Sequence, residues 1–312
     1  MTNVSHVTSF TLKGFVELQK HKYLFFAITL NEYILIVICN SVLISIICLN
    51  KVLHEPMYIF LCALCVNALY GTIAFYPKLL IDLLSDEQVI SYEACIIQIF
   101  IHYSYAMSEF SLLTVMAFDR YISICKPLQY NSIMTVSFVK ALLFTAWCLP
   151  IFMASILIAL TTRLTLCGSV LERICCDNWS VVKLSCQDTS VNNVIGLLLL
   201  IITVFPPLFF IIYTYIQIIS ICVKNSREYR SKAFKTCVPH VVAFINFSIN
   251  VLFEIIHSRL QTTVPHIIKI LMSIEYLVIP PVLNPIIYGL KLQEIWKRLG
   301  TVMCVKRISQ SK

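Results

Sequence analysis

The chain has 312 residues, of which 59% are hydrophobic and only 13% are charged, and its mean hydropathy is +0.84. A typical soluble domain has roughly a quarter of its residues charged, so this chain has too little charge to cover a surface that faces water. This composition excludes an ordinary soluble domain and indicates a protein that lies in a lipid bilayer. Because the apolar runs are long rather than alternating, we expect membrane-spanning helices and not a barrel.

Seven stretches are long enough for the roughly 20 residues that a spanning helix needs. We therefore predict an all-α membrane protein, a bundle of seven transmembrane helices within residues 24–290. Pro77 and Lys78 interrupt the second stretch, and we expect that helix to leave the bilayer near them. Residues 1–23 would form an extracellular tail, and residues 291–312 a short amphipathic helix followed by a cytoplasmic tail. The seven stretches are residues 24–49, 57–84, 95–119, 138–161, 192–223, 238–258 and 267–289.

The positions of Lys and Arg predict which side of the membrane each loop faces. Most of the 24 basic residues fall on segments that lie inside if the C-terminus is cytoplasmic, whereas Asp86, Glu87 and Glu172 fall outside. We therefore expect a multi-pass plasma-membrane protein with its N-terminus outside. The net charge of +8 then reflects topology and contact with inner-leaflet lipid, not nucleic-acid binding. Asn3 and Asn178 begin Asn-X-Ser sequons on the outer side, and we predict glycosylation at both.

One face of the third stretch carries three ionisable residues. Residues about 7, 11 or 18 positions apart return to nearly the same side of a helix, and His102, Glu109 and Arg120 have this spacing. An ionisable group at membrane depth is costly and normally faces the interior of a bundle. We therefore expect this stripe to point inward.

Four motifs occur in four different parts of the chain, and together they resemble the odorant-receptor branch of the rhodopsin-like (class A) G-protein-coupled receptors. The resemblance extends from Asn40 to about Lys297. Residues 67–72 and 75–78 look more like fish-type members than mammalian ones. The motifs are LHEPMY at residues 53–58, MAFDRYISICKPLQY at 116–130, KAFKTCVPH at 232–240 and PVLNPIIY at 281–288.

The resemblance implies a receptor that binds small odorants in an outward-facing transmembrane pocket. It would activate a stimulatory, olfactory-type heterotrimeric G protein and raise cyclic AMP, with no enzymatic activity, cofactor or metal. The nearest alternative is a rhodopsin-like receptor for another small ligand, a peptide or a lipid. A transporter would show internal repeats or broken helices, and an intramembrane enzyme a metal or nucleophile motif. Neither pattern occurs in the sequence.

The family's activation residues match positions at the predicted cytoplasmic end. Asp119 and Arg120 would form an ion pair that holds one state, and Arg120 would exchange partners when the sixth helix moves outward. A proline inside an apolar helix removes one backbone hydrogen bond, so Asn284 and Pro285 would form a hinge. The predicted switch residues are Asp119, Arg120, Tyr121, Tyr215, Asn284, Pro285 and Tyr288.

The predicted ligand pocket lies near the outer third of the bundle. Aminergic receptors have an aspartate where this chain has His102, and a histidine lacks that fixed charge, so an amine held in this way is not expected. Arg259 could meet a carboxylate or another anion, although a cation that reaches to the membrane surface is an equally simple interpretation. The predicted pocket residues are His102, Tyr103, Ala106, Met107, Val251, Leu252, Ile255, Arg259, Ile274 and Leu277.

Glu109 matches an acidic position that is thought to join a sodium or water network in the family. That network usually includes an aspartate on the second helix, and this chain has Ala68 there, with Asn67 beside it. This departure makes a hydrogen-bonded Glu109 as reasonable as a sodium site. We expect Asn40, Asn67 and Glu109 to form a polar network that tunes signalling.

Several cysteines lie outside the predicted spans, where an oxidising environment favours disulfides. The sequence alone does not fix the connectivity, and Cys175 and Cys186 remain alternative partners for Cys95. The family pattern implies a Cys95–Cys176 bridge, which leaves Cys167 and Cys186 for a second one. Either arrangement would pin the long outer loop over the pocket.

Overall fold

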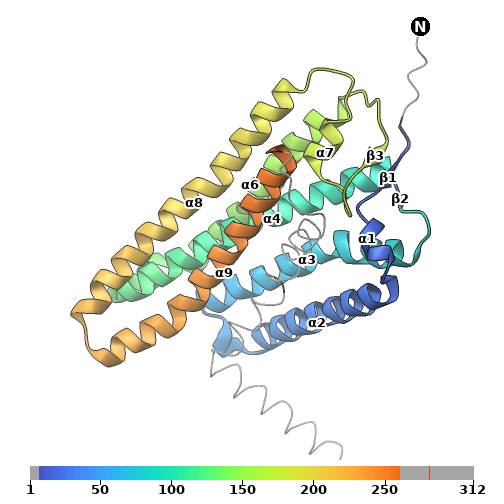
Figure 1. The fold of residues 1–312 in the computed structure, drawn as a ribbon. Coiled ribbons are helices and arrows are strands. Elements are labelled where there is room, and N and C mark those ends of the chain that lie inside the picture. The colour runs from blue at the N-terminus through green and yellow to red at the C-terminus, as the bar shows by residue number, and fades with distance from the viewer. Residues whose placement is uncertain (1–6, 261–280, 282–312) are drawn as a thin grey trace, which may run out of the picture.

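A computed structural model describes residues 7–260 and Pro281. Within this part of the chain, six helices of 27 to 35 residues lie side by side as a bundle (Figure 1). The predicted seventh span and the amphipathic helix after it lie outside the described residues, apart from Pro281. The six helices are α2 (Lys22–Leu49), α3 (Pro56–Leu84), α4 (Tyr92–Cys125), α6 (Val136–Thr162), α8 (Ser190–Lys224) and α9 (Arg227–Leu260).

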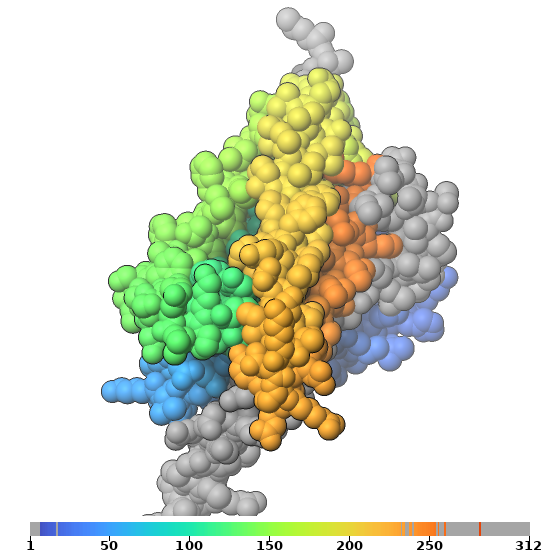
Figure 2. Space-filling model, turned by 90° about the vertical axis from the view of Figure 1, so that its left-hand side faces the viewer, coloured from blue at the N-terminus to red at the C-terminus, as the bar shows by residue number. Residues whose placement is uncertain are grey.

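Four of the described helices, α2, α3, α6 and α8, are long and apolar enough to cross a membrane. They coincide with four of the predicted spans. Helix α8 runs down the middle of one face of the molecule (Figure 2), and large apolar side chains such as Phe209 and Ile216 remain more than half exposed there. Apolar side chains on an outer face of this kind suit contact with lipid.

Helix α4 is the central element and contacts α3, α6, α8 and α9. Its apolar side chains supply much of the main core, including Ile99, Phe110, Leu112 and Met116. It also buries polar groups that a lipid-facing helix would expose at high cost. Its central position therefore explains how the third predicted span can carry acids and an arginine.

Helix α3 ends at Leu84, as the predicted stretch 57–84 does, and it continues through Pro77, because a proline removes a single backbone hydrogen bond and a packed helix tolerates that loss. The structure corrects two other predicted boundaries. Helix α4 is longer at both ends than residues 95–119. Helix α9 begins at Arg227, well before residue 238, since polar residues continue the helix beyond the apolar stretch.

The described part of the N-terminal segment is folded. Its strand β1 (Ser9–Leu12) pairs antiparallel with β2 (Val89–Ser91) and parallel with β3 (Val170–Leu171), so β1 is the middle strand of a small sheet. This sheet lies at one end of the bundle, called the strand end below (Figure 1). The remaining short elements are α1 (Val16–Gln19), η1 (Lys51–Leu53), η2 (Pro127–Gln129), α5 (Tyr130–Ile133) and α7 (Asn178–Val182).

Candidate functional site

A cavity opens towards the strand end between α4, α6, α8, α9 and the loop that follows β3. Its walls are mainly apolar, with a few polar groups contributed by α4, the loop and α9. This composition is typical of a site for a small organic molecule. The lining residues are His102, Tyr103, Ala106, Met107, Phe110, Leu157, Cys175, Cys176, Asp177, Asn178, Trp179, Gly196, Leu199, Leu200, Thr203, Val204, Val251, Ile255 and Arg259.

The structure brings most of the predicted pocket residues to this cavity. On α9, Val251, Ile255 and Arg259 share one face because each follows the previous one by four residues, slightly more than one helical turn. Leu252 does not line the cavity: it is rotated by about 100° from Val251 and packs against the core. Ile274 and Leu277 lie outside the described residues.

Arg259 is held at the outer part of the cavity by neutral groups. Its guanidinium lies 4.5 Å from the centre of the Trp179 ring, and its Nη1 donates to Oδ1 of Asn193 on α8. A Cβ on Gly196 would stand only 2.9 Å from Nη2, so the absence of a side chain there lets Arg259 lie against α8. Among the residues that the structure describes, Arg259 has no salt bridge, although the Asp177 carboxylate attracts it.

Charged residues of both signs, Asp177 and Arg259, line the cavity. Asp177 accepts from Tyr103 Oη at 3.1 Å and from the Ser180 backbone N–H and hydroxyl at 3.0 Å each. Burial lowers the pKa of Lys183, and although Asp177 opposes this shift, the cations Arg173 and Arg259 add to it. The Lys183 ammonium also lies 5.8 Å from the centre of the Trp179 ring.

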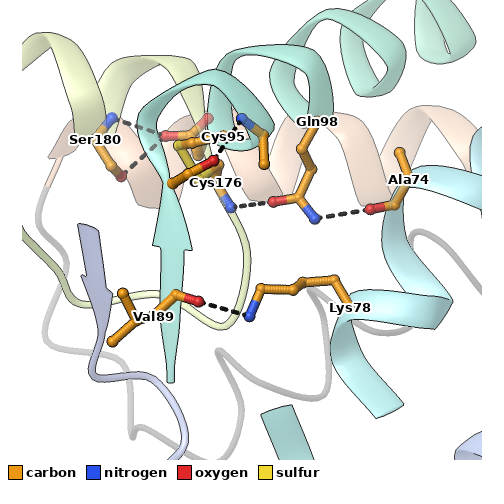
Figure 3. Close-up of a disulfide and its surroundings, with 10 residues drawn as sticks. Ala74, Lys78, Val89, Cys95, Gln98, Cys176 and Ser180 are labelled. Carbon is orange, nitrogen blue, oxygen red and sulfur yellow. Dashed lines mark hydrogen bonds between the residues drawn. A yellow bond between two sulfur atoms is a disulfide. The ribbon is translucent and has the colours of Figure 1, made fainter. Parts of the chain in front are cut away.

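A disulfide and an amide side chain fix the loop over the cavity (Figure 3). Cys95 is bonded to Cys176, with their Cα atoms 5.5 Å apart. The Gln98 side chain donates to Ala74 O on α3 and accepts from the Cys176 N–H, both at 2.8 Å. These contacts tie the loop to two helices at once.

The second loop disulfide joins Cys167 and Cys186, whose Cα atoms are 5.4 Å apart. Between the two bridges, Asn178 is only 5% exposed, and its Oδ1 accepts from Thr161 Oγ1 at 2.7 Å. A glycan on Asn178 would have to pull this amide out of the fold, so the structure argues against the predicted glycosylation there. Asn3 lies outside the described residues.

Deeper in the bundle, Glu109 is 1% exposed and meets α3. Asn67 Nδ2 donates to Glu109 Oε2 at 2.8 Å and to Tyr105 O at 3.1 Å. Asn40 instead donates to Ile36 O at 2.8 Å and to Pro281 O at 2.9 Å. The predicted network is thus an Asn67–Glu109 pair, with Asn40 bonded to the backbone of the seventh predicted span.

The far end of α4 carries the predicted switch residues. Arg120 Nη2 donates to Asp119 Oδ2 at 2.8 Å, and Tyr121 packs near Tyr213 with ring centres 6.4 Å apart. Tyr215 hydrogen-bonds to His240 Nδ1 at 2.9 Å. Asn284, Pro285 and Tyr288 lie outside the described residues.

The comparison with known proteins agrees with this geometry. The sequence matches the family described as "Olfactory receptor" over residues 29–306. Human olfactory receptor 10J5 is 32% identical over 96% of this chain and 97% of its own. Human olfactory receptor 51I2 is 35% identical over 94% of this chain and 95% of its own length. Human olfactory receptor 52K1 is 36% identical over 84% of this chain and 84% of its own length. The chain belongs to the olfactory receptor family.

Membership in the olfactory receptor family makes the chain a non-enzymatic, multi-pass receptor of the plasma membrane and a G-protein-coupled receptor by class. The family implies small-molecule odorant ligands and coupling to G proteins in general. No group of three potential metal ligands gathers anywhere in the described part of this olfactory receptor.

Sequence reasoning missed several residues of this olfactory receptor site. Asp177 and Trp179 lie at the start of the five-residue helix α7, which is too short to show periodicity, so no pattern pointed to them. Thr203 could have been found, since a hydroxyl in the apolar stretch of α8 is unusual, and its Oγ1 is buried in the wall with no hydrogen-bond partner among the described residues. His240 was visible in the 232–240 motif, but its bond to Tyr215 needed the fold.

Proposed function

We propose that this chain is an odorant receptor with seven transmembrane helices, an extracellular N-terminus and a cytoplasmic C-terminus. A small odorant binds in the cavity at the strand end, and the receptor activates a stimulatory, olfactory-type G protein that raises cyclic AMP. What supports the proposal most directly is the cavity on α4 in a chain of this family, with the Asp119–Arg120 pair at the other end of the same helix.

Helix α4 connects the two ends. Ligand contacts with His102, Tyr103 and Met107 on its outer third bias how α4 packs against α8 and α9. Outward movement of α9 would break the Tyr215–His240 hydrogen bond, together with the 2.8 Å contact of His240 Nε2 with Leu113 O. Tyr215 then becomes available to receive Arg120. A ligand shifts this equilibrium only by its difference in affinity for the two states.

The walls suggest the chemistry of the ligand. Apolar side chains such as Leu199, Val251 and Ile255 suit a hydrocarbon body, and Arg259 suits a carboxylate or another anion, because a guanidinium recognises such groups with paired hydrogen bonds. We therefore propose that acidic odorants are among the ligands. The activation hinge at Asn284 and Pro285, and Tyr288 as a second partner for Arg120, belong to the same proposal.

The test is a panel screen in cells that carry the olfactory-type stimulatory G protein. The panel separates amino acids, carboxylic acids, amines, neutral volatiles, peptides and lipids, and the readout is cyclic AMP at a measured surface amount of receptor. We expect at least one class to raise cyclic AMP, and cells without that G protein to stay silent. A response to a peptide or lipid alone, or one through another G protein only, would reject the proposal.

A further inference from the structure

The N-terminal strand β1 joins two outer loops that are far apart in the sequence. The Leu12 N–H donates to Gln88 O at 2.8 Å, on the side of β2. The Lys13 N–H donates to Leu171 O at 2.8 Å, on the side of β3. Removal of β1 would therefore leave β2 and β3 without a common partner, as their placement on either side of β1 shows (Figure 1).

Apolar side chains anchor this segment in the main core. Phe10, Leu12, Phe15 and Leu18 are at most 2% exposed and share one cluster with Ile174 of the loop. Burial of apolar side chains is the main favourable contribution to folding, so the segment is firmly held. None of its residues lines the cavity.

Gly14 is where the N-terminal segment touches the loop most closely. Its N–H donates to Arg173 O at 3.2 Å, and a Cβ added to it would stand 2.5 Å from Ile174 N and 2.8 Å from Arg173 O. Both atoms are backbone, so the loop itself would have to move. The residues that follow directly, 175–179, form the loop wall of the cavity.

The same wall is held from the opposite side by Gln98 and by the Cys95–Cys176 bond (Figure 3). The wall also carries Asp177 and Trp179, which contact Tyr103 and Arg259 of the cavity. A shift of residues 173–174 would therefore disturb both the Tyr103–Asp177 hydrogen bond and the Arg259–Trp179 contact.

We propose that Gly14 and β1 position the cavity wall at residues 175–179 and so help to determine which ligands fit. The N-terminal segment acts without touching the ligand: it sets the place of Asp177 and Trp179 through the backbone of residues 173–174. The consequence for ligand choice rests on the proposed function, whereas the positioning itself does not.

Two variants, each with a matched control, test this positioning role. Gly14→Ala puts a methyl group against backbone, whereas Gly168→Ala, in the same loop region, meets only the flexible end of the Leu184 side chain at 3.0 Å. Phe10→Leu loosens β1 more gently, and Val16→Leu is its control because Val16 is 65% exposed.

Two readouts are compared. Hydrogen–deuterium exchange of purified receptor measures the amides of residues 174–180, which include the bonded N–H groups of Cys176 and Ser180. Cyclic AMP dose–response curves give the ratio of potencies for hexanoic and decanoic acid. We expect Gly14→Ala to speed the exchange several-fold and to change the ratio, and Gly168→Ala to do neither. A merely structural role would lower the surface amount but leave the ratio unchanged.

The inference is overturned if Gly14→Ala leaves the exchange unchanged, or speeds it without changing the ratio. If Gly14→Ala does not fold, Phe10→Leu against Val16→Leu decides by the same two criteria. A wild-type receptor that responds to no odorant, with exchange still faster in Gly14→Ala, would refute the proposed function but not the positioning. The two failures are therefore distinguishable.

Discussion

Both oxygens of the Asp119 carboxylate accept hydrogen bonds. Oδ2 accepts from Arg120 at 2.8 Å and Oδ1 from Tyr130 Oη at 2.7 Å, and the residue is fully buried. Burial, and then the neighbouring Asp119 charge, raise the pKa of Tyr130, so Tyr130 remains a hydrogen-bond donor. Arg120 is held in place, which is the arrangement that we propose for the resting receptor.

Replacing this carboxylate should release Arg120. Asp119→Asn keeps the shape but removes the charge, and a hydrogen bond to a charged group contributes about 1.5–3 kcal/mol. We expect basal cyclic AMP to rise several-fold at equal surface amount. Ser132→Ala, at an exposed position of α5, serves as the control. Unchanged basal signalling in Asp119→Asn would contradict the switch role.

Arg259 gives a second prediction at this scale. Arg259→Ala should raise the concentration of acidic odorant needed for half-maximal response by roughly 10- to 100-fold, and should leave neutral odorants nearly unaffected. Gly196→Ala should act in the same direction, because its Cβ would press on Nη2. Arg163→Ala, at an exposed arginine just after α6, is the control. Equal losses for acidic and neutral odorants would show that Arg259 only anchors the fold.

Glu109 should tune signalling without contacting the odorant. Because Asn67 donates to its carboxylate at 2.8 Å, Glu109→Gln changes the charge and the donor pattern inside the bundle. We expect basal activity or agonist efficacy to change while the rank order of odorants stays the same. If dose–response curves matched wild type in both respects at equal surface amount, this role would be rejected.

At the scale of elements, the contact between α3 and α4 depends on one glycine. A Cβ on Gly71 would stand 2.6 Å and 2.7 Å from two ring atoms of the buried Tyr105. Overpacking of this kind typically costs about 1–3 kcal/mol, so Gly71→Ala should lower the surface amount of receptor and its thermal stability. Ala141→Val, at an exposed position of α6, should change neither. A normal amount of Gly71→Ala at the surface would show that Tyr105 can move aside.

The elements also show which features of the fold could be predicted from the sequence. The apolar runs of α2, α3, α6 and α8 were predicted because run length alone reports membrane crossing. Strand β1 was missed since four residues carry too little pattern, and its pairing partners lie far along the chain. Helix α3 continues through Pro77, because packing along the helix compensates for the missing hydrogen bond. Val251, Ile255 and Arg259 were predicted as pocket residues and line the cavity, whereas Leu252, predicted with them, faces away from it.

At the scale of the whole molecule, one helix links a ligand cavity to an ion pair. Residues 102–110 of α4 line the cavity or lie beside it, Glu109 sits inside the bundle, and Asp119 and Arg120 occupy the far end. The N-terminal sheet covers the strand end, and α8 and α9 meet near the far end through Tyr215 and His240. We propose that this arrangement allows ligand binding in the cavity to change contacts at the opposite end of the bundle.

The most direct test asks whether this cavity is where odorants act. Ala106→Trp fills it from α4, and Leu198→Trp places the same ring at a position of α8 that is 47% exposed. We expect cyclic AMP dose–response curves for active odorants to be lost in Ala106→Trp and kept in Leu198→Trp, at equal surface amounts. Wild-type potency and efficacy in Ala106→Trp would contradict odorant binding in this cavity.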